Sequence, residues 1–104
     1  KDLSISIFGL SYKPDIDDLR ESPALEIAQC LNKLTFNKIM IFEPNISVLP
    51  DGMSNKATLE KDIKKGLKAD ISVLLVAHTE FNCLKKTHYK RSTIIDVCGL
   101  LVED

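Results

Sequence analysis

The sequence lacks long hydrophobic runs and any surplus of charge of one sign. Its longest apolar stretch, residues 71–77, is far shorter than the ~18 residues of a membrane-spanning helix, and the N-terminus shows no basic-then-apolar signal pattern. A formal net charge of -1 with 28% charged residues gives no broad attraction to nucleic acid or to an anionic membrane. We therefore expect a cytoplasmic protein that binds neither, and any anionic ligand must be held by a local group of side chains.

Cysteine and glycine are also scarce. The three cysteines, at positions 30, 83 and 98, are widely spaced without a C-x-x-C pattern, which argues against a disulfide framework and against a zinc site. The four glycines, at positions 9, 52, 66 and 99, cannot supply the G-x-G-x-x-G turn with which a Rossmann unit holds a pyrophosphate. The first strand-to-helix turn reads GLSYKP instead, so this turn is not expected to bind a dinucleotide.

The chain has the length and apolar content of one domain. Its 104 residues, 44% of them hydrophobic, are enough to fill one core. Periodicity predicts strands over residues 3–8, 38–42, 70–77 and 93–97, a helix that starts at Ser22-Pro23 and buries Ala24, Ile27, Ala28 and Leu31, and a weaker helix over residues 59–67. The chain enters its first strand within three residues and has no initiator methionine, so we expect residues 1–104 to be one domain of a longer protein.

Near-continuous apolar strands that alternate with helices predict an α/β fold, a three-layer Rossmann-like domain with a mainly parallel sheet and helices on both faces. Ligands of such domains lie outside the carboxyl ends of the strands, close to the place where the strand order reverses. Residues 9–20, 78–81 and 96–100 are therefore expected along one rim.

The segment GLSYKPDIDDLRESPALEIA, residues 9–28, concentrates charge on that rim. Lys13 and Arg20 can hold a phosphate through their side chains, helped by the backbone N–H groups at the start of the helix after Ser22. Alternatively, both cations pair with the neighbouring acidic residues on a solvated surface. Spacing alone leaves both interpretations open.

Metal binding and catalysis have less support on this rim. An EF-hand loop starting at Asp15 would require glycine where Arg20 stands, so Asp17 and Asp18 are expected to orient that arginine instead of binding a metal. His78, at the carboxyl end of the strongest predicted strand, is either a ligand on the rim or a structural residue. We assign no catalytic residue to the chain.

Residues 9–23 closely resemble the motif that opens the C-terminal, UDP-binding domain of the UDP-glucose/GDP-mannose dehydrogenase family. The wording KPDIDDLRESPALEIA is most similar to the UDP-N-acetylmannosamine dehydrogenase branch of that family. The resemblance continues with lower specificity through IFEPN, ADISVLLVAHTEF and IIDVCG, and so covers most of the chain.

The resemblance implies a function in nucleotide-sugar oxidation. The family oxidises the C6 hydroxymethyl group of a nucleotide sugar to a carboxylate with NAD, and the branch implies UDP-N-acetylmannosamine as substrate, for surface polysaccharide synthesis. It places Tyr12 and Lys13 against the UDP-sugar and Arg20 on the NAD side of an interdomain cleft. NAD itself and the nucleophilic cysteine would belong to N-terminal and central domains outside this chain, in a homo-oligomeric parent enzyme. The 104 residues alone are expected to be inactive.

One position departs from the family pattern. The last strand of the family commonly ends in Asp-Thr-Arg/Lys-Gly, whereas this chain has Cys98 in place of the basic residue. A thiol cannot make the cationic contact that the resemblance would place there. UDP-glucose and UDP-N-acetylgalactosamine therefore stay open as substrates, and a non-catalytic nucleotide-binding module stays open as a function.

Overall fold

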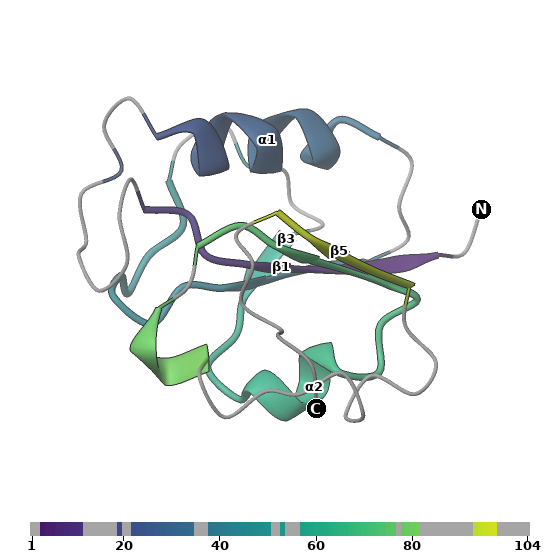
Figure 1. Cartoon of the computed structure of the whole chain (residues 1–104). Helices are drawn as coiled ribbons and strands as arrows, with labels where there is room; N and C mark the ends of the chain where they lie inside the picture. The colour runs from purple at the N-terminus through teal and green to yellow at the C-terminus, as the bar shows by residue number, and fades with distance from the viewer. Residues whose placement is uncertain are drawn as a thin grey trace.

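The central layer of the domain is a five-stranded sheet in which every pairing is parallel (Figure 1). The computed structural model describes residues 3–11, 19, 22–34, 38–50, 53, 57–76, 78–81 and 93–97. The strands are β1 (Ser4–Phe8), β2 (Lys38–Phe42), β3 (Ala57–Leu59), β4 (Ile71–Leu74) and β5 (Thr93–Asp96). Helix α1 (Pro23–Asn32) covers one face, and α2 (Ile63–Gly66) with the 3-10 turn η1 (Thr79–Phe81) lies on the other. The predicted three-layer α/β architecture is confirmed.

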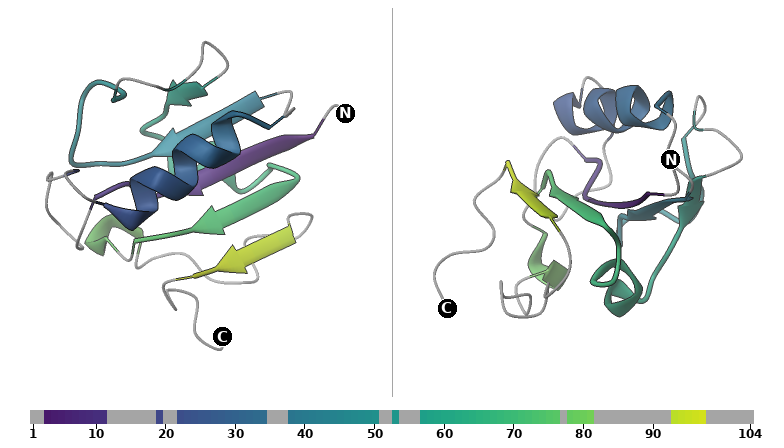
Figure 2. Two further views of the ribbon diagram at one scale, coloured as in Figure 1. Left: turned by 90° about the horizontal axis from the view of Figure 1, so that it is seen from above. Right: turned by 90° about the vertical axis from the view of Figure 1, so that its right-hand side faces the viewer.

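The strand order β3-β2-β1-β4-β5 is that of a doubly wound sheet. From β1 the chain proceeds outward to β2 and β3, and it then returns to build β4 and β5 on the other side of β1 (Figure 2). The order therefore reverses between β1 and β4, and this is the topological switch point at which such folds hold ligands. The described parts of the predicted rim, after β1, β4 and β5, do lie at the carboxyl ends of the strands.

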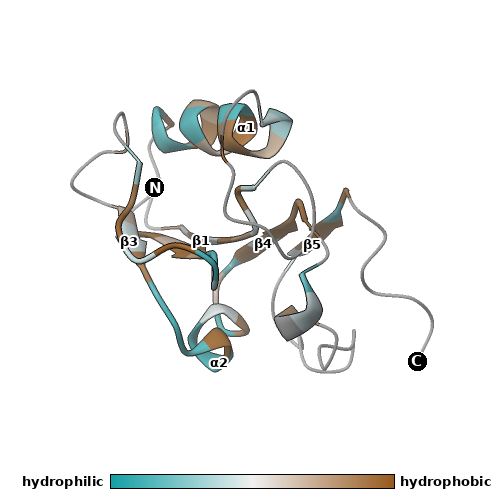
Figure 3. Ribbon diagram, turned by 90° about the vertical axis from the view of Figure 1, so that its left-hand side faces the viewer, coloured by the Kyte–Doolittle hydropathy of each residue, from teal (hydrophilic) through white to brown (hydrophobic). Residues whose placement is uncertain are grey.

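Both faces of the sheet are buried, which explains why its strands are apolar at successive positions. Ile5 and Ile7 of β1 belong to the core under α1, whereas Phe8 belongs to the core on the α2 side. There the Phe8 ring stacks on Phe42 at 4.8 Å between centroids and meets Phe81 edge-on at 5.3 Å. Figure 3 shows the result as apolar strands lying between helices with polar segments.

Helix α1 begins as predicted but presents a different face to the sheet. Ser22 is the N-cap and accepts a hydrogen bond from the N–H of Leu25, with proline at the first helical position. Ala24 and Ala28 are buried as predicted. Ile27, predicted to join them, is 39% exposed, because the buried face turns toward Leu25 and leaves Ile27 beyond its margin. That part of the prediction is wrong.

The predicted helix over residues 59–67 is wrong at its start. Leu59 is instead the last residue of β3, whose hydrogen bonds come from pairing with β2, and the helix begins only after the N-cap Asp62. A strand of three residues is too short to show a period of two in the sequence. The helix ends at Gly66, where an added Cβ would come within 2.7 to 2.9 Å of the Phe42 and Phe8 rings.

Two serines attach α2 to the sheet from below. Ser6 of β1 and Ser72 of β4 are partners in the sheet register, and both are fully buried. Their hydroxyls donate to one acceptor, the carbonyl oxygen of Gly66, at 2.8 and 3.5 Å. The otherwise apolar layer between α2 and the sheet therefore contains one polar attachment point.

Candidate functional site

The switch point is closed by contacts between the ends of β1 and β4. The carbonyl oxygen of Phe8 accepts hydrogen bonds from the N–H groups of Leu75 (2.9 Å) and Val76 (3.3 Å). Gly9 follows with a φ of +99°, and a Cβ at this position would lie 2.5 Å from the Cβ of Val76. Glycine is required here by both conformation and space. The chain leaves β1 in a direction fixed by this turn.

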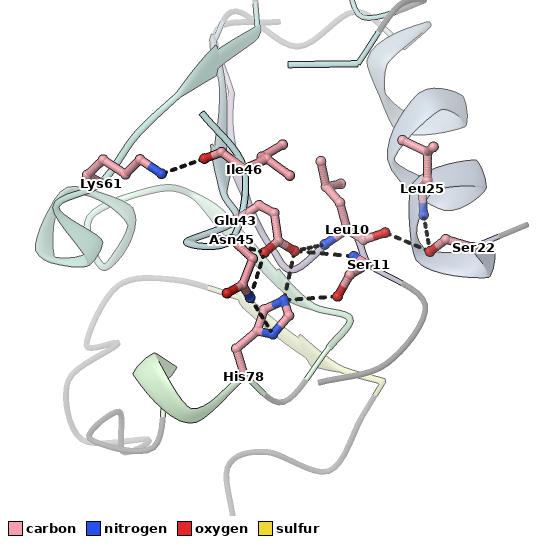
Figure 4. Close-up of polar contacts among 9 residues, drawn as sticks. All are labelled: Leu10, Ser11, Ser22, Leu25, Glu43, Asn45, Ile46, Lys61 and His78. Carbon is pink, nitrogen blue, oxygen red and sulfur yellow. Dashed lines mark hydrogen bonds and ion pairs between the residues drawn. The ribbon is translucent and has the colours of Figure 1, made fainter. Parts of the chain in front are cut away.

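A buried carboxylate holds the next two residues (Figure 4). Glu43 follows directly after β2, and its side chain is fully buried. Its Oε1 accepts hydrogen bonds from the N–H groups of Leu10 (2.8 Å) and Ser11 (3.2 Å). Its Oε2 accepts one from the N–H of Asn45 at 3.0 Å. A carboxylate of β2 thus fixes the start of the loop that follows β1.

His78, which follows β4, completes this arrangement. Its Nε2 lies 2.7 Å from Oε1 of Glu43, and Ser11 Oγ lies 3.3 Å from the same nitrogen. The amide nitrogen of Asn45 lies 3.3 Å from both His78 Nδ1 and Glu43 Oε2. Because that amide nitrogen can only donate, the network assigns Nδ1 as acceptor and Nε2 as the protonated nitrogen that donates to Glu43. The imidazole thus has a fixed orientation between Glu43 and Asn45.

Two opposing influences set the ionisation of Glu43. Burial disfavours the charged form and raises its pKa, whereas hydrogen bonds from His78 and from the N–H groups of Leu10 and Asn45 stabilise the carboxylate. The hydrogen bonds prevail, so the pKa of Glu43 lies below its ordinary value of 4.5. The site contains a permanent internal anion at neutral pH.

Ser22 ties the far end of the charged loop back to its beginning. Its hydroxyl donates to the carbonyl oxygen of Leu10 at 2.6 Å while it caps α1 (Figure 4). Leu19, just before the helix, packs against the core under α1, and its carbonyl oxygen accepts from the N–H of Ser22. Residues on either side of the loop are thus held together at one place on the rim.

The predicted ligand-binding side chains themselves lie outside the described residues. This applies to Tyr12, Lys13 and Arg20, to the acidic residues at positions 15, 17 and 18, and to Cys98. His78 is described, and the structural alternative holds for it: its side chain is fully buried and hydrogen-bonded to Glu43. The described part of the chain contains no group of three potential metal ligands and no helix long and apolar enough to cross a membrane.

Glu43 was not singled out by the sequence analysis. It stands in IFEPN, between the buried strand β2 and a proline, where the neighbouring segments carry several other acidic residues. The available signal was its position. A carboxylate placed directly after an apolar parallel strand lies at the ligand-binding edge of the sheet.

The turn after β1 does not fit the pyrophosphate of NAD. A dinucleotide-binding turn offers free backbone N–H groups and glycines that let the phosphate approach. Here Glu43 already accepts the N–H groups of Leu10 and Ser11, and Gly9 is packed against Val76. The N–H groups of Leu10 and Ser11 are therefore not available to an anion.

A small cleft lies beside Glu43 on the α2 side. It measures about 140 Å³ and is lined by Phe42, Glu43, Pro44, Glu60, Lys61, Ile63 and Phe81. The ammonium group of Lys61 donates to the carbonyl oxygen of Ile46 at 2.7 Å. Pockets for drug-sized ligands measure about 300 Å³ or more, so this cleft does not enclose a nucleoside diphosphate.

Known proteins are similar to this chain in sequence. Residues 6–103 match the model of the UDP-glucose/GDP-mannose dehydrogenase family, UDP binding domain. The UDP-N-acetyl-D-mannosamine dehydrogenase of Yersinia pestis is 36% identical over 99 residues, which are 95% of this chain and 24% of that protein. The NDP-N-acetyl-D-galactosaminuronic acid dehydrogenase of Ralstonia nicotianae is 39% identical over 100 residues, 96% of this chain and 23% of that protein.

A solved structure agrees with both the fold and the family. The UDP-N-acetyl-mannosamine dehydrogenase of Staphylococcus aureus superimposes with a TM-score of 0.76 and 27% sequence identity, over 100% of this chain and 24% of that chain. The chain thus spans about a quarter of the length of its relatives, all three of which are dehydrogenases. The doubly wound sheet and the charged sequence between β1 and α1 agree with these matches. The chain belongs to the UDP binding domain of the UDP-glucose/GDP-mannose dehydrogenase family.

Proposed function

We propose that this chain binds the UDP part of a nucleotide sugar within an NAD-dependent UDP-sugar 6-dehydrogenase. The observation that carries the proposal is the fixed start of the charged loop at the switch point. Leu10 and Ser11 are held there by Glu43, and the N–H of Gly9 donates to the carbonyl oxygen of Phe42, so the two residues that follow start from a fixed backbone. The family that shares this segment is described by its UDP binding.

In the proposed site, Tyr12 and Lys13 contact the UDP-sugar and Arg20 faces the cofactor. Lysine is suited to this role because a charge-assisted hydrogen bond to phosphate contributes about 1.5 to 3 kcal/mol. The internal anion Glu43 lies at the base of the loop, where it repels a second anion. The phosphates are therefore expected next to the lysine and away from the backbone of Leu10.

The remaining parts of the enzyme are proposed to lie outside this chain. The relatives are about four times longer, and the turn after β1 does not fit NAD. We propose that residues 1–104 form the C-terminal domain of such an enzyme, and that its N-terminal and central domains supply the NAD site and the nucleophilic cysteine. A cytoplasmic homo-oligomer that serves surface polysaccharide synthesis completes the proposal.

UDP-N-acetylmannosamine is the proposed substrate. It is supported by the 36% identity to the Yersinia pestis enzyme and by the wording of the charged loop. The N-acetylgalactosamine nucleotide is the second candidate, because the Ralstonia nicotianae relative is 39% identical. Kinetics of the full-length protein with NAD and each UDP-sugar separate the two. If the full-length protein forms no NADH with either of these sugars or with UDP-glucose, a non-catalytic module is favoured.

Calorimetric titration of the full-length protein with UDP tests the site itself. Lys13→Ala should weaken UDP binding about tenfold, which corresponds to the loss of one charge-assisted contact. Lys68→Ala is the matched control. This exposed lysine lines a groove with Ser4 and Lys38 at the opposite edge of the sheet, and its removal should leave the affinity unchanged. Equal affinities of the wild-type and Lys13→Ala proteins would exclude the Lys13 assignment.

A further inference from the structure

We infer that Glu43 and His78 are positioning residues of the nucleotide site, which hold the backbone at Leu10 and Ser11, directly before the proposed UDP-sugar residues Tyr12 and Lys13. Neither is placed to touch the ligand, since both side chains are fully buried. The inference rests on the proposed function, because it concerns the same site. It adds a pair of residues from two other strands on which the geometry of that site depends.

The contacts of Glu43 come from segments that follow different strands. Glu43 follows β2, His78 follows β4 by a few residues, and the two backbone N–H groups that Glu43 accepts follow β1. The carboxylate therefore joins the ends of three neighbouring strands at the switch point (Figure 4). Ser11, the last residue held, is adjacent in sequence to the aromatic-lysine pair. A displacement of Ser11 is passed directly to that pair.

The burial of the Glu43 carboxylate itself requires an explanation. A buried carboxylate is expensive unless its oxygens are satisfied, and an apolar side chain of similar volume would often be as stable or more so. Glu43 accepts hydrogen bonds on both oxygens, from backbone groups on two sides, from Asn45 and from His78. What an apolar replacement cannot supply is the fixed direction of the Leu10 and Ser11 N–H groups. The carboxylate is therefore best explained by the loop conformation that it selects.

His78 in turn holds the Glu43 carboxylate. His78 donates from Nε2 to the same oxygen that receives both loop N–H groups, and at 2.7 Å this is the shortest of the Glu43 contacts described above. Asn45 holds the other ring nitrogen, so the ring cannot rotate without breaking two contacts. Removal of the imidazole would leave Glu43 short of its strongest side-chain donor. The carboxylate would then shift or take up water, and the loop N–H groups would follow it.

The test uses the full-length protein and separates the two ligands. His78→Leu should weaken UDP binding and raise the KM for the UDP-sugar by about tenfold, the effect of one lost hydrogen bond to a buried charge. The KM for NAD should change less than about twofold, on the same scale. His78→Gln, whose amide can donate from a similar position, should recover most of the UDP affinity. A purely structural role would not produce this split or this recovery.

Two further variants keep the inference falsifiable. Asn45→Ala removes a partner of both members of the pair but leaves them in place, so it should weaken UDP binding in the same direction and by less. Ser6→Ala removes a different buried hydrogen bond, from β1 to the carbonyl oxygen of Gly66 in α2, and should leave UDP affinity unchanged. Should His78→Leu fail to fold, Asn45→Ala and His78→Gln decide the question. Folded variants that bind UDP as tightly as the wild type would overturn the inference.

The outcome also distinguishes the inference from the proposed function. A wild-type protein that does not bind UDP, or a Lys13→Ala variant that binds it equally well, contradicts the proposed site. UDP binding that is lost with Lys13→Ala but unaffected by His78→Leu and Asn45→Ala retains the site and rejects the positioning role.

Discussion

Glu43 is a charged side chain enclosed by the protein, and its ionisation is linked to folding. Because its pKa is lower in the folded state than the ordinary 4.5, the carboxylate contributes stability that is fully present above pH 4.5. That contribution is lost as the pH falls through the lower, folded-state pKa. His78 is the titratable side chain that faces Glu43 directly.

Glu43→Gln should therefore change the pH dependence of stability. The difference in unfolding free energy between wild type and variant, measured by urea denaturation, should shrink as the pH falls below 4.5. The difference is the diagnostic quantity, since Glu60 also has a lowered pKa and affects both proteins equally. A difference that stays constant down to pH 3 would contradict the linkage of Glu43 to folding.

Gly9 has both a left-handed backbone and no room for a side chain. Gly9→Ala should lower the unfolding free energy by about 2 kcal/mol or more, since strain of the backbone and the clash with Val76 add together. Val76→Gly in the same chain removes the Cβ and Cγ2 atoms that the new side chain would meet, but it leaves the contact with the Val76 backbone nitrogen and the backbone strain. The double variant should accordingly recover part of the loss relative to the sum of the single variants, in a denaturation cycle. Strict additivity would exclude the contact as a cause.

At the scale of elements, α1 and α2 each begin with a side-chain cap, but only one cap also contacts the candidate site. Ser22 caps α1 and donates to Leu10, whereas Asp62 caps α2 far from the charged loop along the chain. Loss of an N-cap costs about 1 kcal/mol of stability. The two caps therefore form a natural pair for comparison.

Ser22→Ala and Asp62→Ala should both destabilise the protein by about 1 kcal/mol. Ser22→Ala should in addition weaken UDP binding by the full-length protein, because the loop loses the bond that joins its end to its beginning, while Asp62→Ala should not. Ser22→Thr, which keeps the hydroxyl, should resemble the wild type. Thermal melting and calorimetry measure the two effects. Equal UDP affinities of the two alanine variants would argue against a coupling of α1 to the site.

The sequence was sufficient to predict the elements that carry a strong local signal. Residues 38–42 and the start of α1 at Ser22-Pro23 were predicted correctly, because an apolar run and a cap are local signals. The short strand β3 was missed because its stability comes from pairing with β2. Which helical stripe is buried depends on the angle at which α1 lies on the sheet, so the exposure of Ile27 could not be read locally.

The candidate site was predictable to a similar extent. Parallel strands and the switch-point rule gave the correct edge of the sheet, and they placed His78 on it. The partnership of His78 with Glu43 joins residues 35 positions apart in the chain. No spacing rule links two such residues, because their proximity is created by the strand order.

At the scale of the whole molecule, the domain presents one half of a site. Both described ends of the charged loop lie at one edge of the sheet, but the cleft beside Glu43 is too small for a nucleotide, and Leu10 and Ser11 do not offer free N–H groups to NAD. We propose that a second surface, outside this chain, completes the binding site. The relatives, with about three quarters of their length outside the match, have the chain to provide it.

The 104-residue chain should therefore produce no NADH from NAD and UDP-N-acetylmannosamine, whereas the full-length protein should. It should also bind UDP at least about tenfold more weakly than the full-length protein, since contacts from the missing surface are lost. Absorbance of NADH and calorimetry measure the two quantities. Turnover by the short chain would contradict the division of labour proposed for this enzyme.

The carbonyl oxygen of Gly66, shared by two buried serines, has a consequence for how the lower layer responds to mutation. Gly66 packs closely against the Phe8 and Phe42 rings, and the two hydrogen bonds add a fixed direction to that packing. The serine pair therefore helps to fix the position of α2 along the sheet. Replacing both serines with alanine should leave a folded domain whose helix occupies several positions, visible as broadened or doubled NMR signals from α2.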